Sequence, residues 1–182
     1  MKLVRKHWII LLLTPLVLLL DQTSKLLVHR FFYPYQARQI IPGFLEFRLV
    51  FNRGLAFGLF SDQLGPYSTW IFLGITLIAF GIIIHLFFRT DHRALLLPTA
   101  LSLVLAGALG NLIDRFRWGY VVDFINLYYR RFVWPTFNVA DIAITVGIIL
   151  LLIDSFRPEK SSRSEKVEVE KEPGSGEEKC IQ

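Results

Sequence analysis

Long apolar stretches constrain the fold of this chain more than any other feature of its sequence. The clearest runs from Trp70 to Phe88, 19 residues without Asp, Glu, Lys or Arg. As a helix it would be about 28 Å long, close to the ~30 Å hydrocarbon core of a bilayer. Similar stretches cover about residues 7–28, 94–113 and 137–153, and 53% of all residues are hydrophobic, more than an ordinary soluble domain contains. The sequence therefore predicts a mainly α membrane protein with four transmembrane helices.

The first stretch reaches spanning length only by taking in charged residues. His7 to Leu20 is too short, and extension through Val28 places Asp21 and Lys25 inside the last turns. These two residues are spaced i, i+4 with the acid first, which favours an ion pair. No small-x-small cleavage site follows Leu20, so we interpret the stretch as a span rather than a cleaved secretory signal.

The segments between the stretches have distinct characters. In the first loop, residues 29–67, Leu45–Asn52 partly alternates apolar and polar residues, a turn signal follows at 52–54, and 55–60 is apolar again. We expect a small extracytoplasmic β-platform lying on the membrane, its aromatic residues toward lipid or substrate; an interfacial loop without site residues is the alternative. The second loop, 116–136, is rich in Tyr, Trp and Arg, typical of an interface belt. Residues 157–182 are charged and are expected to form a disordered cytoplasmic tail beyond a membrane domain of residues 1–156.

Charge and cysteine content narrow the topology and chemistry. The net charge of +5 is interpreted as membrane-flanking Lys and Arg, because no basic patch interleaved with aromatic residues indicates nucleic-acid binding. Four spans place both termini on one side, which would carry 11 of the 20 Lys and Arg; this bias favours cytoplasmic termini. Cys180 is the only cysteine, and the four histidines lack metal-ligand spacing, so no metal and no cofactor are expected.

Polar residues from separate segments are predicted to gather at one membrane face. Placing an ionisable group beside hydrocarbon costs roughly 2.5–3.5 kcal/mol on insertion scales. Such groups are therefore kept only where they are paired, in contact with water or needed for function. Because consecutive spans cross in opposite directions, the end of the first span, the end of the third span and the start of the fourth span lie at the same face. The loop that joins the third and fourth spans is on that side as well. The residues concerned are Asp21, Lys25, Asn111, Asp114, Arg115, Asp123, Asn138 and Asp141.

Spacing within this layer suggests different roles. Asn111, Asp114 and Arg115 share a helix face, so Asp114 and Arg115 are predicted to form a structural ion-pair and hydrogen-bond cluster beside Asn111. Asp123 and Asp141 have no cation close by in sequence, and carboxylates in apolar surroundings have raised pKa values. If they meet, they would share a proton, as in aspartic proteases. From spacing alone, it is equally possible that Asp123 is a solvated acid in a loop and that the helix dipole stabilises the charge of Asp141. Spacing also leaves open whether the catalytic pair is Asp114 and Asp141.

Five short motifs, in this order, resemble the lipoprotein signal peptidase (signal peptidase II) family of bacterial aspartyl membrane proteases. The resemblance covers about residues 8–155. The motifs are Asp21-Gln22-x-x-Lys25, Asn52-Arg53-Gly54-x-Ala56-Phe57, Gly107-Ala108-x-Gly110-Asn111-Leu112-x-Asp114-Arg115, Val121-x-Asp123-Phe124 and Phe137-Asn138-x-Ala140-Asp141.

This resemblance implies an endopeptidase that removes the signal peptide from diacylglyceryl-modified prolipoproteins just before the lipidated cysteine. By the family pattern, Asp123 and Asp141 are the catalytic dyad, one acting as base on a water and the other as acid. Residues that would shape the pocket or hold substrate are Asn52, Gly107, Asn111, Arg115 and Asn138, and those that would support it are Asp21, Lys25 and Asp114. The implied partners are prolipoproteins and membrane lipid, with a monomeric enzyme in the bacterial inner membrane.

Two other classes of protein compete with this interpretation of the sequence. A small proton-coupled transporter would use membrane acids as a relay, but its site is expected near the bilayer midplane between repeats, and neither feature is present in the sequence. A non-catalytic scaffold would use the polar layer for assembly. It predicts that removing the carboxylate of Asp123 or Asp141 weakens association rather than turnover.

Overall fold

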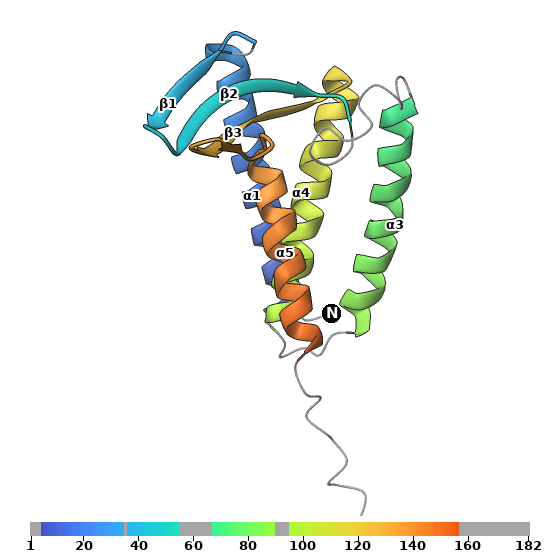
Figure 1. Ribbon diagram of the computed structural model, residues 1–182. Coiled ribbons are helices and arrows are strands. Elements are labelled where there is room, and N and C mark those ends of the chain that lie inside the picture. Colours follow the sequence, from blue (N-terminus) through green and yellow to red (C-terminus); the bar gives the residue numbers. More distant parts are fainter. Residues whose placement is uncertain (1–4, 35, 55–66, 90–94, 157–182) are drawn as a thin grey trace, which may run out of the picture.

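The computed structural model describes residues 5–34, 36–54, 67–89 and 95–156, in which helices stand side by side with a small sheet at one end (Figure 1). The predicted apolar segment at 55–60 and the predicted tail at 157–182 lie outside these residues. The described elements are α1 (Arg5–Phe31), β1 (Ala37–Ile41), β2 (Leu45–Asn52), α3 (Ser68–Arg89), α4 (Leu96–Trp118), β3 (Val121–Tyr129), β4 (Phe132–Val133) and α5 (Val139–Ser155).

Helix α4 is central and packs against α1, α3 and α5. Small residues allow α4 and α5 to approach closely: a Cβ at Gly107 would collide with the Ala140 carbonyl oxygen, and one at Gly147 would lie 2.9 Å from the Ala100 carbonyl oxygen. Close backbone approach at small residues is the usual way in which membrane helices associate. The α4–α5 contact therefore fixes where the start of α5 lies relative to α4.

The outer surfaces of the helices are apolar. Leucine and isoleucine side chains along α1, α3 and α5 are exposed, among them Leu12, Leu19, Ile78 and Ile149. Such a surface is incompatible with water and fits a lipid environment. Two described helices, Arg5–Phe31 and Leu96–Trp118, are long and apolar enough to cross a membrane. That α3 and α5 also cross it stays a prediction.

The third helix differs from the predicted stretch. Residues 94–113 were expected to form it, whereas α4 continues to Trp118 and ends at Gly119, which has the left-handed conformation that glycine adopts readily (φ 76°). Asp114 and Arg115 thus lie inside the helix, where they are buried. The charged residues do not end the helix because surrounding groups form hydrogen bonds and ion pairs with them.

The sheet is antiparallel, with strand order β1-β2-β3-β4. The strand predicted at Leu45–Asn52 is β2. The second loop, interpreted from sequence as an interface belt, supplies β3 and β4, which were not predicted, and β3 pairs with β2 along Leu45–Asn52. The sheet packs on the end of α1 through a buried cluster of Val28, Leu49, Val122 and Phe124. Residues of both loops are thereby fixed over the same end of the helices.

Candidate active site

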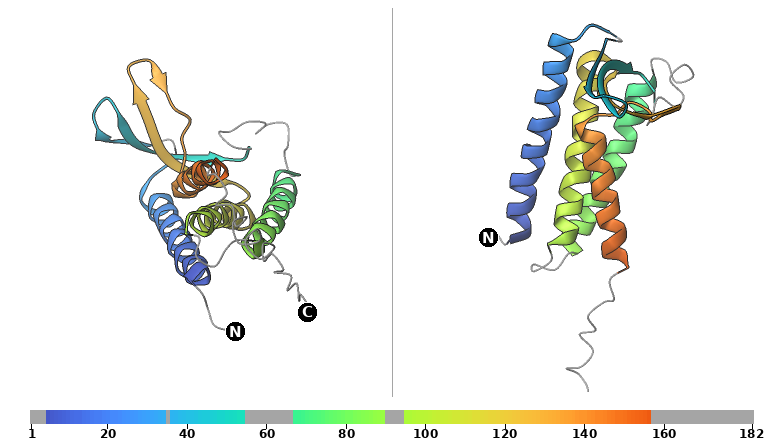
Figure 2. Two further views of the ribbon diagram at one scale, coloured as in Figure 1. Left: turned by 90° about the horizontal axis from the view of Figure 1, so that it is seen from below. Right: turned by 60° about the vertical axis from the view of Figure 1, so that its left-hand side comes forward.

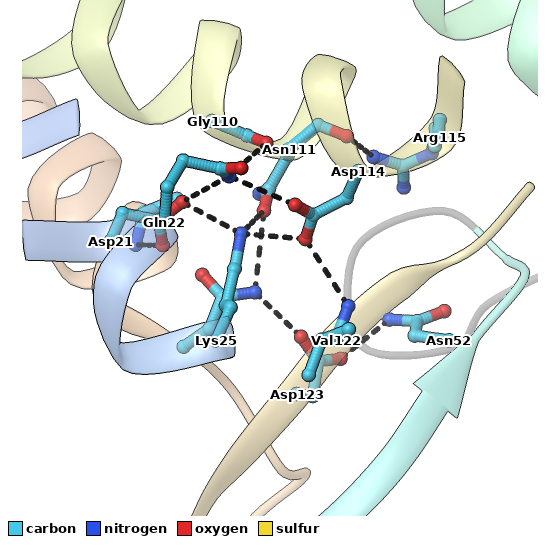
Figure 3. Close-up of polar contacts among 12 residues, drawn as sticks. Asp21, Gln22, Lys25, Asn52, Gly110, Asn111, Asp114, Arg115, Val122 and Asp123 are labelled. Atoms are coloured by element: carbon cyan, nitrogen blue, oxygen red, sulfur yellow. Dashed lines mark hydrogen bonds and ion pairs between the residues drawn. The ribbon is translucent and has the colours of Figure 1, made fainter. Parts of the chain in front are cut away.

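Asp123 lies on β3 with its carboxylate almost completely buried, 2% exposed. Its Oδ2 accepts a hydrogen bond from Asn52 Nδ2 (2.9 Å), and its Oδ1 accepts one from Asn138 Nδ2 (2.6 Å). Because β2 and β3 are neighbours in the sheet, Asn52 and Asp123 lie beside each other although they are far apart in sequence (Figure 3). Two carboxamides thus fix the orientation of this carboxylate.

Asp141 lies in the first turn of α5, and Asn138 caps that helix. The Asn138 Oδ1 accepts from the Asp141 backbone N–H (3.0 Å), and Asp141 Oδ2 accepts from the Asn138 backbone N–H (3.2 Å), which makes a reciprocal capping box. The other oxygen, Oδ1, accepts from Asn111 Nδ2 (2.8 Å). The Asp141 carboxylate is therefore held at a helix N-terminus, where the backbone dipole favours negative charge.

Asn138 joins the two carboxylates, because its side chain contacts Asp123 while its backbone contacts Asp141. Both acids line one cavity of about 350 Å³, a size usual for small-ligand sites. The cavity is lined by Asn52, Ile75, Thr76, Ala108, Asn111, Leu112, Arg115, Val121, Asp123, Asp141, Ile144, Thr145 and Ile148. Its charged and carboxamide groups come from β2, β3, α4 and α5, and most of the rest of its wall is apolar.

The electrostatics of Asp123 are unusual for a carboxylic acid. Its pKa is raised from 3.8 to about 7, mainly by burial and also by repulsion from the Asp141 carboxylate. The hydrogen bonds from Asn52 and Asn138 and the charge of Lys25 act in the opposite direction. At neutral pH this group therefore exchanges a proton readily. That property suits general acid–base chemistry, for which the best pKa lies near the working pH.

A buried ion-pair network contacts Asn111, one of the residues that line the cavity (Figure 3). The Lys25 Nζ is 2.9 Å from Asp21 Oδ2 and 2.9 Å from Asp114 Oδ2, and it donates to Asn111 Oδ1 (2.9 Å). All three charged side chains are fully buried. The Asn111 amide is thereby oriented so that its oxygen faces Lys25 and its nitrogen faces Asp141.

This network also fixes the backbones that carry the two acids. Asp21 Oδ1 accepts from the Ala140 backbone N–H (2.9 Å), next to Asp141, and Asp114 Oδ2 accepts from the Val122 backbone N–H (3.3 Å), next to Asp123. A disturbance of the ion pairs would therefore displace both carboxylates.

The ion pair predicted between Asp114 and Arg115 is wrong. Neighbouring residues on a helix point in different directions, and Asp114 instead pairs with Lys25. Arg115 lines the cavity, and its guanidinium donates to the Asn111 and Gly54 carbonyl oxygens (both 3.1 Å). It thus holds the end of β2 against α4 and adds positive charge beside the two acids.

Most of the residues singled out from the sequence converge here: Asp21, Lys25, Asn52, Asn111, Asp114, Arg115, Asp123, Asn138 and Asp141. Gly107 lies among the α4–α5 helix contacts instead, outside the lining of the cavity. Sequence reasoning gave no role to Gln22, whose Nε2 donates to Asp114 Oδ1 (2.9 Å) and the Gly110 carbonyl oxygen (3.2 Å). Its carboxamide inside an apolar stretch was the available signal.

Metal binding has no candidate ligand set in the described part of the chain, where no group of three or more His, Cys, Asp or Glu side chains could hold an ion. The chemistry available from the described residues is that of two carboxylates with four orienting amide or guanidinium groups.

Comparisons with known proteins agree on one family. Residues 13–157 match the family model described as Signal peptidase (SPase) II. A lipoprotein signal peptidase of Syntrophus aciditrophicus (strain SB) is 39% identical over 157 residues, covering 86% of this chain and 98% of that protein. A lipoprotein signal peptidase of Acinetobacter baylyi is 43% identical over 157 residues, 86% of each chain. A solved structure described as a bacterial membrane enzyme, obtained by the in meso method at 2.3 Å, superimposes with a TM-score of 0.74 at 31% identity, covering 87% of this chain and 93% of that one.

Proposed function

Since the chain belongs to the signal peptidase II family of membrane peptidases, we propose that it cleaves diacylglyceryl-modified prolipoproteins just before the lipidated cysteine and releases the signal peptide. Asp123 and Asp141 are the catalytic dyad, and no cofactor takes part. This assignment is preferred to a transporter or a scaffold because both the family and the site chemistry are those of a peptidase.

The observation that carries this proposal is the meeting of the two acids at one cavity. Asp123 and Asp141 are joined through Asn138 and line the same space. The pKa of Asp123, raised to about 7 by burial and by repulsion from Asp141, supports a pair that holds one proton near neutral pH. Aspartic proteases use such a pair to activate water.

The surroundings of the two acids suggest their separate roles. Asp141 acts as the base, because its carboxylate lies at the N-terminus of α5, where Asn111 Nδ2 and the Asn138 backbone N–H hold it in place. Asp123 is the acid, because burial favours its protonated form. Asp141 takes a proton from the attacking water while Asp123 protonates the peptide carbonyl oxygen. As the tetrahedral intermediate collapses, the proton on Asp141 passes to the leaving nitrogen, the C–N bond breaks, and a hydroxyl proton of the intermediate returns to Asp123.

The rest of the cavity suits a lipid-modified substrate. Its apolar lining includes Ile75, Leu112, Ile144 and Ile148, which would contact acyl chains or the apolar signal peptide. The polar groups Asn52, Asn111 and Arg115 would hold substrate backbone next to the acids, with Asn138 orienting the dyad and Gly107 allowing the helix contact that places it. Asp21, Lys25 and Asp114 support them. We infer that the sheet cradles the signal peptide.

For the topology we propose four spans, α1, α3, α4 and α5, with both termini in the cytoplasm of a bacterium. The start of α1 and the end of α5 lie at one end of the helices, and the sheet and the start of α5 lie at the other (Figure 1). Asp123 is on β3 and Asp141 is in the first turn of α5, so both acids belong to the second end. The active site would then be near the extracytoplasmic face of the inner membrane. The enzyme acts as a monomer.

The test is cleavage by the purified chain in detergent of two synthetic substrates that differ only in the diacylglyceryl group. Mass spectrometry should find one new amino terminus, at the lipidated cysteine, and no product from the unmodified peptide. Asp123→Asn and Asp141→Asn should each abolish cleavage, whereas Asp154→Asn, at the opposite end of α5, should not. Cleavage of both substrates alike, or an active Asp123→Asn protein, would contradict the proposal.

A further inference from the structure

Two β-hairpins project sideways from the helices at the sheet end of the molecule. Seen along the helix axes, the hairpins β1–β2 and β3–β4 extend beyond the outline of the helices (Figure 2, left). They are tied to each other by Tyr128, whose hydroxyl accepts from the Gly43 backbone N–H (3.2 Å) and whose backbone N–H donates to the Phe44 carbonyl oxygen (2.9 Å). Both hairpins therefore overhang whatever surrounds the helices.

The end of the β3–β4 hairpin, residues 129–134, here called the hairpin tip, is exposed and of unusual composition. Tyr129, Phe132 and Val133 are 61%, 64% and 60% exposed, and Trp134 is 46% exposed. Apolar side chains exposed together in this way mark a contact surface. The tip contributes nothing to the lining of the cavity, so this surface is distinct from the candidate active site.

The turn of the hairpin tip consists of Arg130 and Arg131, between the cross-strand pair Tyr129 and Phe132. Arg130 has φ 55°, a conformation in which two-residue hairpin turns favour glycine or asparagine. Its guanidinium lies 5.4 Å from the Tyr129 ring centroid. An arginine at a backbone position suited to glycine indicates that its charge serves a purpose other than folding.

The two hairpins are strongly basic. Residues 36–48 and 125–136 contain four arginines and one acid, Glu46. The Glu46 carboxylate is already occupied, by Arg48 (2.7 Å) and by Asn126 Nδ2 (2.9 Å). The surplus charge therefore comes from Arg38, Arg130 and Arg131, and its complement is an anionic partner.

We propose that the hairpin tip docks on the headgroup layer of the surrounding membrane, with Arg130 and Arg131 binding the phosphates of anionic phospholipids. The exposed apolar surface of the helices places lipid directly below the overhanging hairpins. Tyrosine and tryptophan concentrate at membrane interfaces, and arginine binds phosphate through paired N–H groups. The ligand is an anionic lipid at a site separate from the active site, and the inference does not depend on the catalytic assignment.

The test is fluorescence quenching of Trp134 by phospholipids brominated close to the headgroup. The full chain is reconstituted in zwitterionic phosphatidylcholine vesicles containing phosphatidylglycerol, with the bromine on one lipid or the other. The Trp134 signal is the difference between the wild type and Trp134→Phe. We expect quenching by the brominated anionic lipid to exceed quenching by the brominated zwitterionic lipid at equal mole fraction by at least about two-fold, and this excess to fall with added salt.

Matched variants separate charge from structure. Arg130→Gln with Arg131→Gln should remove the excess, Lys at both positions should retain most of it, and Arg5→Gln with Arg30→Gln, two exposed arginines outside the hairpins, should leave it unchanged. Arg130→Gly, combined with Arg131→Gln, removes the same charge without straining the turn and should act like the double Gln variant. Absence of quenching, equal quenching by both lipids, or an equal loss in the Arg5 and Arg30 control would overturn the proposal.

Discussion

Replacing Asp123 with asparagine should make the stability of the protein less dependent on pH. Asp123 has a pKa of about 7 in the folded protein, raised first by burial and then by Asp141, against 3.8 ordinarily. The folded state therefore binds the proton more tightly than the unfolded state. Stability that this group contributes at low pH is lost as pH rises from 3.8 through about 7. The asparagine side chain carries no titrating proton, so this loss should disappear in the variant.

The size of the effect follows from the two pKa values. Each pKa unit corresponds to about 1.4 kcal/mol, so the difference between 3.8 and about 7 amounts to about 4 kcal/mol when titration is complete. Between about pH 5 and about pH 8 the linkage relation gives a loss of about 2.5 kcal/mol. Asparagine also places an NH₂ group against the donors Asn52 or Asn138, which costs roughly 1–3 kcal/mol at every pH. The contribution of the Asp123 proton is therefore measured by how the stability difference between variant and wild type changes with pH, and not by the size of that difference at one pH.

The assay is equilibrium unfolding in detergent at about pH 5 and about pH 8 for the wild type, Asp123→Asn and the control Asp154→Asn. Relative to wild type, Asp123→Asn should gain about 2.5 kcal/mol on going from the lower to the higher pH, and the control should gain almost none. An Asp123→Asn protein whose difference from wild type is the same at both pH values would refute the reasoning. The Asp123 carboxyl would then titrate in its ordinary range.

Three further substitutions test the support of the site. Lys25→Met leaves two buried carboxylates without their cation and should lower the free energy of unfolding by about 3–5 kcal/mol, measured by chemical unfolding; a loss below about 1 kcal/mol would show that the network is not buried. Gly107→Ala should cost about 1–3 kcal/mol, because its Cβ meets the Ala140 carbonyl oxygen, whereas Gly81→Ala has nothing within 4 Å and should be neutral or stabilising; equal effects in thermal unfolding would contradict the packing. Asn138→Ala should cost about 1 kcal/mol through the lost cap and lower kcat about 100-fold, because Asp123 loses its 2.6 Å hydrogen bond; unchanged kcat would remove Asn138 from the site.

Much of the site could be predicted because the alternation of the apolar stretches indicates which polar groups lie at the same end of the helices. Asp21 and Lys25 at i, i+4 form the predicted ion pair. Alternation of the apolar stretches was sufficient to bring together residues more than a hundred positions apart. The hydrogen bond from the Ala140 backbone N–H to Asp21 is the direct expression of that convergence.

What sequence spacing could not supply is the direction of individual side chains and the pairing of strands. Asp114 was assigned to its neighbour Arg115, but helix geometry points it at Lys25, on another helix. β3 was missed because the loop that contains it is rich in aromatic and basic residues and resembled an interface belt, and its partner β2 is more than 60 residues away. Without β3, the contact between Asn52 and Asp123 could be expected only from the family resemblance.

The most direct test of the account is whether Asp123 and Asp141 act as one unit. Single-turnover cleavage of the diacylglyceryl-modified substrate would be measured for wild type, Asp123→Asn, Asp141→Asn and the double variant. Two residues that share one proton-transfer step are strongly non-additive, so the double variant should be no slower than the slower single variant. If the two losses multiply, the acids act in separate steps or one acts only on stability, and the shared dyad is contradicted.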